Sequence, residues 1–189
     1  DTNDAAALSG SRVRASFEDG RGRLWVGTYG GGLNRFDREL GAFERFRHDP
    51  ASTSSLASDR VTAVFEDEDG RLWVGTTGGL NLFDESNRSF VRYTNDASDV
   101  TSLGDDAVTA IFQDRGGMLW VGTQNRGVSK WNPRTWAYGL DDARELAADQ
   151  QSAPNVTSFL EDRAGTLWVG TFGDGLSALD REAGTTRTF

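Results

Sequence analysis

The sequence predicts an all-β fold made of four similar four-stranded antiparallel sheets. Three observations predict it: a repeat of 47 to 48 residues that occurs four times, a period-two alternation of apolar residues, and Gly- or Asp-rich turns between short apolar segments. The clearest part of the repeat is the pentapeptide Leu-Trp-Val-Gly-Thr. Its four copies are Leu24–Thr28, Leu72–Thr76, Leu119–Thr123 and Leu167–Thr171.

Each repeat is expected to contain four short strands, called A to D in chain order. In the second repeat, strand A is Val61–Glu66, where apolar residues alternate with others. Asp67–Gly70 follows as a tight turn, because Asp bonds turn backbone and Gly accepts positive φ. Strand B is the pentapeptide, and a glycine-rich turn separates it from strand C at Leu80–Phe83. Strand D is expected at Phe90–Tyr93, and a polar link then leads to the next repeat.

Small and apolar residues on both faces of these strands indicate sheets that are covered on both sides. Each repeat is therefore expected to be one blade of a β-propeller, and the chain a partial ring. The expected blades lie at approximately 13–46, 61–93, 108–140 and 156–189 of one segment that spans 1–189. A linear β-solenoid usually has shorter repeats and is the less favoured alternative.

The third repeat departs from the pattern. Gln124–Gly127 replaces the glycine-rich turn, and Asn132–Tyr138 is expected to distort strand D. Leu140–Ala148 has the apolar spacing of a short helix. At the start of the chain, Asp1–Leu8 aligns with the later link Asp49–Leu56, so we expect these repeats to come from a longer array.

The composition excludes several classes of function. The net charge is −9, and the 19 Arg and single Lys form no basic block, which argues against nucleic-acid binding. The chain has no Cys, and His48 is its single His, so neither a Cys-rich zinc site nor the usual general base or transition-metal cluster is expected. No apolar run approaches the ~20 residues of a membrane span. No cofactor or metal is therefore expected. Contact with a membrane is expected only through other parts of a longer protein.

Other motifs also favour structural interpretations. The acidic stretch Glu66–Gly70 lacks the full ligand spacing of a calcium loop. The glycine-rich turns precede strands and lack Gly-Lys-Ser/Thr, so they are not phosphate loops. No pair of carboxylates stands out for glycoside hydrolysis, so we assign no catalytic residue and do not expect an enzyme. The repeat tryptophans are interpreted as blade-packing residues rather than sugar platforms, because each occupies a strand interior: Trp25, Trp73, Trp120 and Trp168.

Any ligand is expected on the face that carries the B–C turns and the D–A links. In a meander, strand B ends at the edge where strand A begins, so these connections share one face, and loops on a rigid scaffold often bind ligands. Residues that differ among repeats gather there and suit a sugar's apolar face and hydroxyl rim. The candidates are Tyr29, Gln124, Asn125, Arg126, Phe172 and Asp174. The alternative, that they are ordinary solvated loop tips, stays open.

The repeat resembles that of the two-component regulator propeller family. The shared residues are Val-Thr-Ala-Val-Phe-Glu-Asp, Gly-x-Leu-Trp-Val-Gly-Thr and Gly-Gly-Leu-Asn-x-Phe-Asp, with the link Ser55–Val61. The resemblance implies the extracytoplasmic sensor region of a membrane histidine kinase, hybrid kinase or diguanylate cyclase. Such sensors are generally seven-bladed propellers, and several respond to oligosaccharides. The resemblance thus implies a non-catalytic, periplasmic segment that binds an oligosaccharide or another small ligand.

Two other classes of function stay open at this stage. One is a propeller carbohydrate-active enzyme, such as a lyase or a glycosidase, and the other is a protein-interaction scaffold. We also expect copies of this chain to associate with one another, because the first and last blades would each expose an apolar face.

Overall fold

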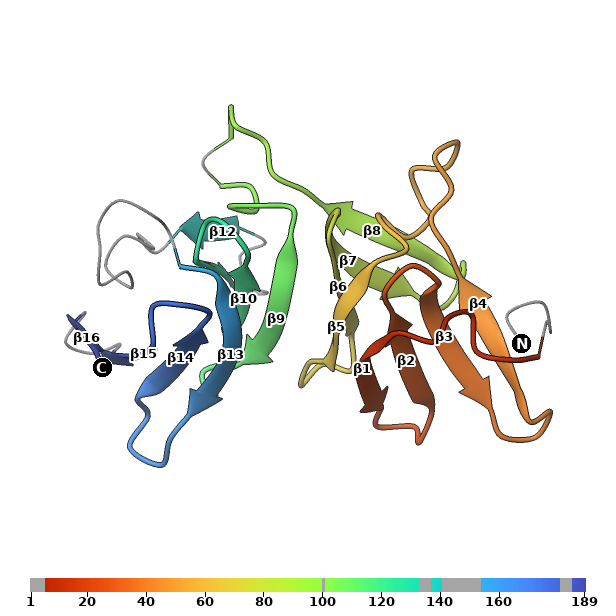
Figure 1. The fold of residues 1–189 in the computed structure, drawn as a ribbon, viewed down its shortest axis with the longest axis horizontal. Helices are drawn as coiled ribbons and strands as arrows, with labels where there is room; N and C mark the ends of the chain where they lie inside the picture. Colours follow the sequence, from red (N-terminus) through yellow and green to blue (C-terminus); the bar gives the residue numbers. More distant parts are fainter. Residues whose placement is uncertain (1–5, 100, 133–136, 141–153, 181–184) are drawn as a thin grey trace. The chain divides into compact units, whose positions relative to one another are not determined.

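The computed structural model describes residues 6–99, 101–132, 137–140, 154–180 and 185–189. These residues form sixteen strands and no helix, and the strands make four four-stranded antiparallel sheets (Figure 1). In each sheet the strands lie side by side in chain order, which confirms the predicted all-β class and the meander A-B-C-D.

The chain forms two compact units, one that ends at Tyr93 and one that begins at Thr94. The first sheet of the first unit contains β1 (Val13–Glu18), β2 (Leu24–Thr28), β3 (Gly32–Asp37) and β4 (Ala42–Phe46). Its second sheet contains β5 (Val61–Glu66), β6 (Leu72–Thr76), β7 (Gly79–Asp84) and β8 (Ser89–Tyr93).

The second unit repeats this plan. Its first sheet contains β9 (Val108–Gln113), β10 (Leu119–Thr123), β11 (Val128–Asn132) and β12 (Ala137–Leu140). Its second sheet contains β13 (Val156–Glu161), β14 (Leu167–Thr171), β15 (Leu176–Asp180) and β16 (Thr185–Thr188). We number these sheets as blades one to four.

Within each unit, strand A of the second blade lies against the first blade. β5 contacts β1 and β2, and β13 contacts β9 and β10. The glycine of the pentapeptide makes the close approach possible. A Cβ added to Gly27 would stand 2.5 Å from Cγ1 of Val61, and one added to Gly122 would stand 2.6 Å from Cγ1 of Val156. This glycine therefore leaves space for the strand A valine of the following blade.

Each repeat tryptophan is tied to the A–B turn of its own blade. The indole Nε1 donates to the carboxylate of an Asp six residues earlier, at 2.7 to 2.8 Å. The four pairs are Trp25 with Asp19, Trp73 with Asp67, Trp120 with Asp114 and Trp168 with Asp162. The other oxygen of each Asp accepts two backbone N–H groups of the turn, as in the bonds from Arg21 and Arg23 to Asp19.

The tryptophan rings pack against apolar or aromatic side chains. Trp25 is fully buried, and its ring centroid is 5.3 Å from that of Phe83 in the second blade. Trp120 belongs to the corresponding core of the second unit, together with Val156 of the fourth blade. Trp73 and Trp168 lie beside aromatic rings at the end of their own blades, Tyr93 and Phe189, at 5.8 Å in each case.

The D–A link folds back onto the outer strand of the blade that follows it. In the second blade, the backbone N–H of Phe90 donates to Ser54, and the Arg92 guanidinium donates to the carbonyl oxygens of Ser52 and Ser55. Leu56 of the same link is fully buried. The link thus covers part of the outer edge of strand D and sets where the next strand A begins.

In the third repeat, β12 pairs antiparallel with β11, so the blade has a fourth strand despite its divergent sequence. Leu140 is the last residue of that strand rather than the start of a helix. The rest of the expected helical stretch, 141–148, lies outside the described residues, as do residues 133–136 of the segment expected to be distorted.

Candidate functional site

One backbone hydrogen bond recurs where the B–C turn meets the start of strand A. The residue after the pentapeptide donates its N–H to the carbonyl oxygen of the residue before strand A, at 2.8 to 3.1 Å. The four pairs are Tyr29 with Arg12, Thr77 with Arg60, Gln124 with Ala107 and Phe172 with Asn155. The side chains at this bond differ among the repeats, whereas the backbone contact is the same.

In the first unit, this contact places Tyr29 at the junction of two blades. Tyr29 forms an isolated antiparallel bridge with Arg60, which precedes strand A of the second blade. The N–H groups of Gly30 and Gly32 both donate to the carbonyl oxygen of Asp59, at 2.9 Å. Gly32 has a φ of 80° and faces the carbonyl oxygen of Phe46, so the turn requires glycine there.

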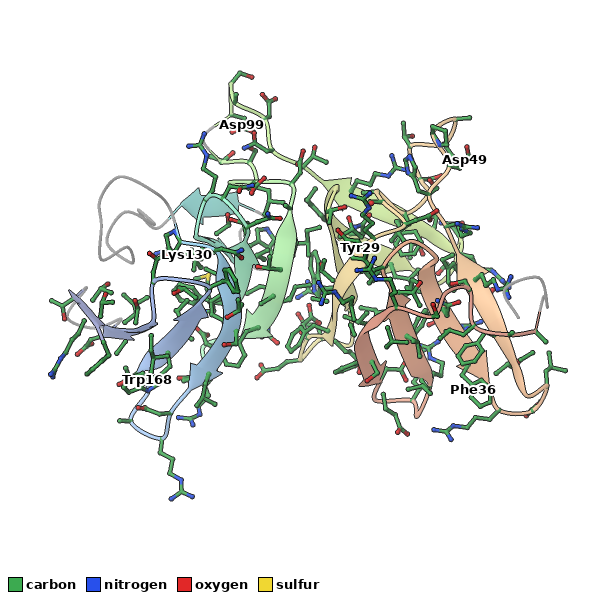
Figure 2. All side chains as sticks on the ribbon, in the orientation of Figure 1. Tyr29, Phe36, Asp49, Asp99, Lys130 and Trp168 are labelled. Carbon is green, nitrogen blue, oxygen red and sulfur yellow. The ribbon has the colours of Figure 1, made fainter. Side chains whose placement is uncertain are left out.

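Three guanidinium groups surround the ring of Tyr29. The Cζ atoms of Arg12, Arg14 and Arg60 lie 5.1, 5.5 and 5.3 Å from the ring centroid, within the range of cation–π contacts. Figure 2 labels Tyr29, which lies among nitrogen-bearing side chains. Tyr29 is half-buried, and the three arginines are exposed. We call these four residues the Tyr29 cluster.

The carboxylate nearest in sequence to this cluster has other partners. Asp59 Oδ2 accepts from Arg47 at 3.0 Å, and its Oδ1 accepts from the backbone N–H of His48 at 2.7 Å. In the part of the chain that the structure describes, no carboxylate lies within 4.0 Å of the guanidinium nitrogens of Arg12, Arg14 or Arg60. The Tyr29 cluster is therefore a local concentration of positive charge in a chain whose net charge is −9.

In the second unit, three candidates follow one another on the B–C turn of the third blade. Asn125 donates from its backbone N–H and from Nδ2 to Asp105 Oδ2, at 2.9 and 2.8 Å. The backbone N–H of Arg126 donates to Thr123 Oγ1 at 3.2 Å. Gln124, Asn125 and Arg126 are all exposed. The Asp105 bonds fix Asn125 onto the preceding link and leave the neighbouring side chains open to solvent.

The fourth blade carries the other two candidates. Phe172 is 77% exposed, although it is a large apolar side chain. Gly173 and Gly175 have φ of 105° and 78°, so the turn reverses sharply around Asp174. Tyr29 thus belongs to the first unit, and the five other candidates belong to two turns of the second unit.

The three arginines of the Tyr29 cluster were not predicted from the sequence. Arg12 and Arg60 occupy the same repeat position, directly before the strand A valine, where the later repeats have Ala107 and Asn155. Arg14 stands where the other three repeats have Thr. A comparison of the repeats position by position, carried into strand A rather than confined to the turns, would have found them.

A cavity lies at the opposite ends of the strands in the second unit. Its volume is about 520 Å³, and it is lined by the A–B turns of the third and fourth blades and by Asp180. Glu161 Oε2 accepts the backbone N–H of Arg115 there at 2.8 Å, and Glu66 accepts that of Gly20 in the first unit in the same way. The glutamate is therefore part of a repeated contact between blades.

Among the described residues, no three His, Cys, Asp or Glu side chains come together as metal ligands would. Nor do these residues include a helix with the length and hydropathy needed to cross a membrane.

The repeat matches the model of a known protein family. The model of a family described as two component regulator propeller matches residues 7–30, 55–78, 102–125 and 150–173, which is just over half of the chain. Each matched segment contains a D–A link or its end, strand A, the pentapeptide and the first residues of the B–C turn. No curated protein sequence matches the chain.

Solved structures with a similar fold include extracellular domains of bacterial two-component and one-component systems. The extracellular domain of a hybrid two-component system from B. thetaiotaomicron has a TM-score of 0.84 and 26% identity, over 96% of this chain and 25% of that one. This chain thus spans about a quarter of its length. The extracellular domain of a one-component system from the same organism has a TM-score of 0.53 and 22% identity, over 100% of this chain and 32% of that one.

An enzyme shares the fold at lower identity. Virginiamycin B lyase from Staphylococcus aureus has a TM-score of 0.66 and 12% identity, over 100% of this chain and 57% of that one. At this identity, the likeness concerns the fold alone.

Proposed function

Because this chain belongs to the two-component regulator propeller family, we propose that it is a ligand-binding segment of an extracytoplasmic sensor. The observation that carries the proposal is the recurring backbone bond at the B–C turns. It holds a different side chain at the same place in each blade, namely Tyr29, Thr77, Gln124 and Phe172. A constant backbone with variable side chains is how a rigid scaffold presents a binding surface.

The chemistry of these side chains favours an oligosaccharide as ligand. Phe172 exposes an apolar ring that could stack on the face of a sugar. In the third blade, Gln124 at the same repeat position and Arg126 two residues later are exposed and offer amide and guanidinium donors for hydroxyl groups. The similar extracellular domain from B. thetaiotaomicron supports a location outside the cytoplasm.

We propose that this role is binding rather than catalysis. A glycosidase needs two carboxyl groups roughly 5 to 10 Å apart that face one sugar. The side chains that vary at the B–C turns are instead aromatic, amide and guanidinium groups with Asp174 as the one acid among the six candidates. His48 lies in a link, where its Nδ1 is 2.8 Å from the carbonyl oxygen of Leu56.

The proposal is tested by a glycan array followed by calorimetric titration with the glycan that binds most tightly. In the chain that carries Tyr29→Ala, Arg126→Ala and Phe172→Ala together, we expect the affinity to fall at least tenfold. Leu40→Ala is the matched control, because Leu40 is 79% exposed and lies in a C–D turn at the other end of the strands. An unchanged affinity in the triple variant would place the ligand elsewhere. Cleavage of the glycan, seen by mass spectrometry, would instead show an enzyme.

A further inference from the structure

We propose that the Tyr29 cluster is a subsite for the anionic group of an acidic oligosaccharide, a carboxylate or a sulfate. This inference rests on the proposed function and names the class of ligand. It concerns the junction of the first and second blades, where Arg12, Arg14 and Arg60 surround one tyrosine ring.

The geometry gathers three cations in a small volume. Each guanidinium carbon lies 5.1 to 5.5 Å from the same ring centroid. No two of them can be further apart than the sum of their two distances, which is close to the Debye length of about 10 Å at 0.1 M salt. The three charges therefore repel one another, and salt screens that repulsion only in part.

The backbone fixes this arrangement. Tyr29 donates its N–H to the carbonyl oxygen of Arg12 and forms a bridge with Arg60, so the ring and two of the arginines start from bonded backbone positions. Arg14 lies within β1, two residues after Arg12. The backbone of the cluster is thus held by a strand and a constrained turn, and little backbone ordering is left for a ligand to impose.

The electrostatics favour an anion that comes from outside the chain. No carboxylate among the described residues neutralises the three arginines, although the chain as a whole carries nine more negative than positive charges. The contacts with Tyr29 are cation–π contacts, and each guanidinium group carries N–H donors in its plane. Those donors match two oxygens of a carboxylate or a sulfate, which Arg binds in a fork geometry.

The cluster does not follow from the repeat itself. In the second unit, Ala107 and Asn155 replace the arginines before strand A, and Thr109 and Thr157 replace Arg14. Both units nevertheless form the same four-stranded sheets. The fold therefore does not need three arginines at this position.

The experiment compares probes of equal length on the full 189-residue chain. The probes are a galacturonic acid oligosaccharide, a sulfated oligosaccharide and a neutral galactose oligosaccharide, with inorganic sulfate as a fourth. We expect one acidic oligosaccharide to bind more tightly than the neutral one, and its affinity to fall as salt is raised. Tighter binding of the galacturonic acid probe indicates a carboxylate ligand, and tighter binding of the sulfated probe indicates a sulfate.

Arginine variants locate the binding. We expect each of the single variants Arg12→Gln, Arg14→Gln and Arg60→Gln to lower the affinity for the acidic probe roughly two- to fivefold, as is typical of exposed ion pairs. Combined, they should remove the preference over the neutral probe. Arg163→Gln is the matched control, since Arg163 is an exposed arginine in an A–B turn of the fourth blade. Tyr29→Phe should keep the preference, and Tyr29→Ala should reduce it.

A purely structural role of the cluster makes a different prediction. If the cation–π contacts only stabilised the fold, the triple Gln variant would lower the melting temperature and leave the probe affinities unchanged. We expect the reverse, with an unchanged or raised melting temperature at low salt, because the substitutions remove like charges. Tight binding of the neutral probe that the Gln variants do not alter would overturn the anionic subsite and leave the proposed function standing. Failure of all four probes to bind would overturn both proposals. Binding of inorganic sulfate without any oligosaccharide would leave an anion site at the Tyr29 cluster and overturn the oligosaccharide as its ligand.

Discussion

The carboxylate of Asp19 accepts a hydrogen bond from the indole N–H of Trp25 at 2.7 Å, inside the first blade. Both side chains are buried, with exposed fractions of 5% and 0%. The other oxygen of Asp19 accepts the N–H groups of Arg21 and Arg23, so one carboxylate closes the A–B turn and fixes the indole. The same set of bonds in all four repeats explains why an Asp stands six residues before each repeat Trp.

We expect Asp19→Ala to lower the free energy of unfolding of the first unit by about 2 to 4 kcal/mol. The substitution leaves the indole N–H and two turn N–H groups without their acceptor in a buried place. Urea unfolding followed by Trp fluorescence measures the change. Asp69→Ala is the control, because the Asp69 side chain is 69% exposed and holds only an ion pair with Arg71. A cost below about 0.5 kcal/mol for Asp69→Ala is typical of exposed pairs, and a similar cost for Asp19→Ala would contradict the role of this carboxylate.

Stability should fall in acid for the same reason. Burial by itself would raise the pKa of Asp19, but the hydrogen bonds from Trp25 and Arg23 outweigh it and lower the pKa. The bond from Trp168 lowers the pKa of Asp162. A carboxyl group whose pKa is lowered by folding stabilises the fold above its unfolded value and loses that contribution as the pH falls through the folded value.

We therefore expect the melting temperature to be stable from pH 7 to about pH 4, near the unfolded pKa of Asp, and to drop below it. For the variant with Asp19→Asn and Asp162→Asn, the melting temperature should be lower at pH 7 than that of the parent. It should also change less as the pH falls below about 4. Thermal unfolding at a series of pH values measures both. Equal slopes for the variant and the parent would show that these two carboxylates do not set the acid response.

The glycine of the pentapeptide gives a test of the packing between blades. We expect Gly27→Ala to destabilise the first unit by about 1 to 3 kcal/mol, as overpacked cores do. The new methyl group would stand 2.5 Å from Cγ1 of Val61. Gly10→Ala is the control, because its nearest atom would be at an ordinary 3.5 Å. Chemical denaturation of both variants measures the difference.

A double variant separates this clash from other effects of the substitution. Val61→Ala removes the atom that the new methyl group meets, at the cost of a small cavity. In Gly27→Ala with Val61→Ala, the total cost should therefore be smaller than the sum of the two single costs. Additive costs would mean that Gly27 does not serve to admit Val61.

The repeat made the strands predictable from the sequence, but the side-chain hydrogen bonds that connect them were not predicted. Period-two alternation and turn residues are local signals, so the strands of the second repeat, Val61–Glu66 among them, were found close to their observed bounds. The bond between Asp67 and Trp73 joins residues on either side of a turn. Both residue types were noted in the sequence, but each was explained alone, the Asp by its turn and the Trp by packing.

The candidate site was predictable only in part, for a related reason. Turn residues such as Tyr29 and Phe172 stand out because they vary beside an invariant pentapeptide. Arg14 lies inside a strand, where an exposed charged residue is unremarkable in the sequence. Its contact with Tyr29 depends on how strand A lies against the B–C turn, which involves residues 15 positions apart. Such a cluster follows from the tertiary fold and not from any local pattern.

Association of the isolated chain remains a proposal, and the structure suggests which side chains to change. Val13 is 49% exposed, whereas its equivalents Val61, Val108 and Val156 are at most 1% exposed. Leu176 is 40% exposed, whereas Leu33, Leu80 and Val128 at the same position are at most 1% exposed. In the first unit, Val61 packs over Gly27 of the preceding blade. We propose that Val13 of one copy packs in the same way over Gly170 of another.

Val13→Asp and Leu176→Asp should each weaken self-association of the 189-residue chain at least tenfold, because burial of one such side chain stabilises a contact by about 1.5 to 3 kcal/mol. Sedimentation velocity over a range of concentrations measures the dissociation constant. Val91→Asp is the control, since Val91 is 50% exposed on the outer strand β8, away from strand A. A parent chain that stays monomeric at high concentration would refute the association, and loss of association in all three variants alike would show that general apolar exposure, rather than the contact between blades, drives it.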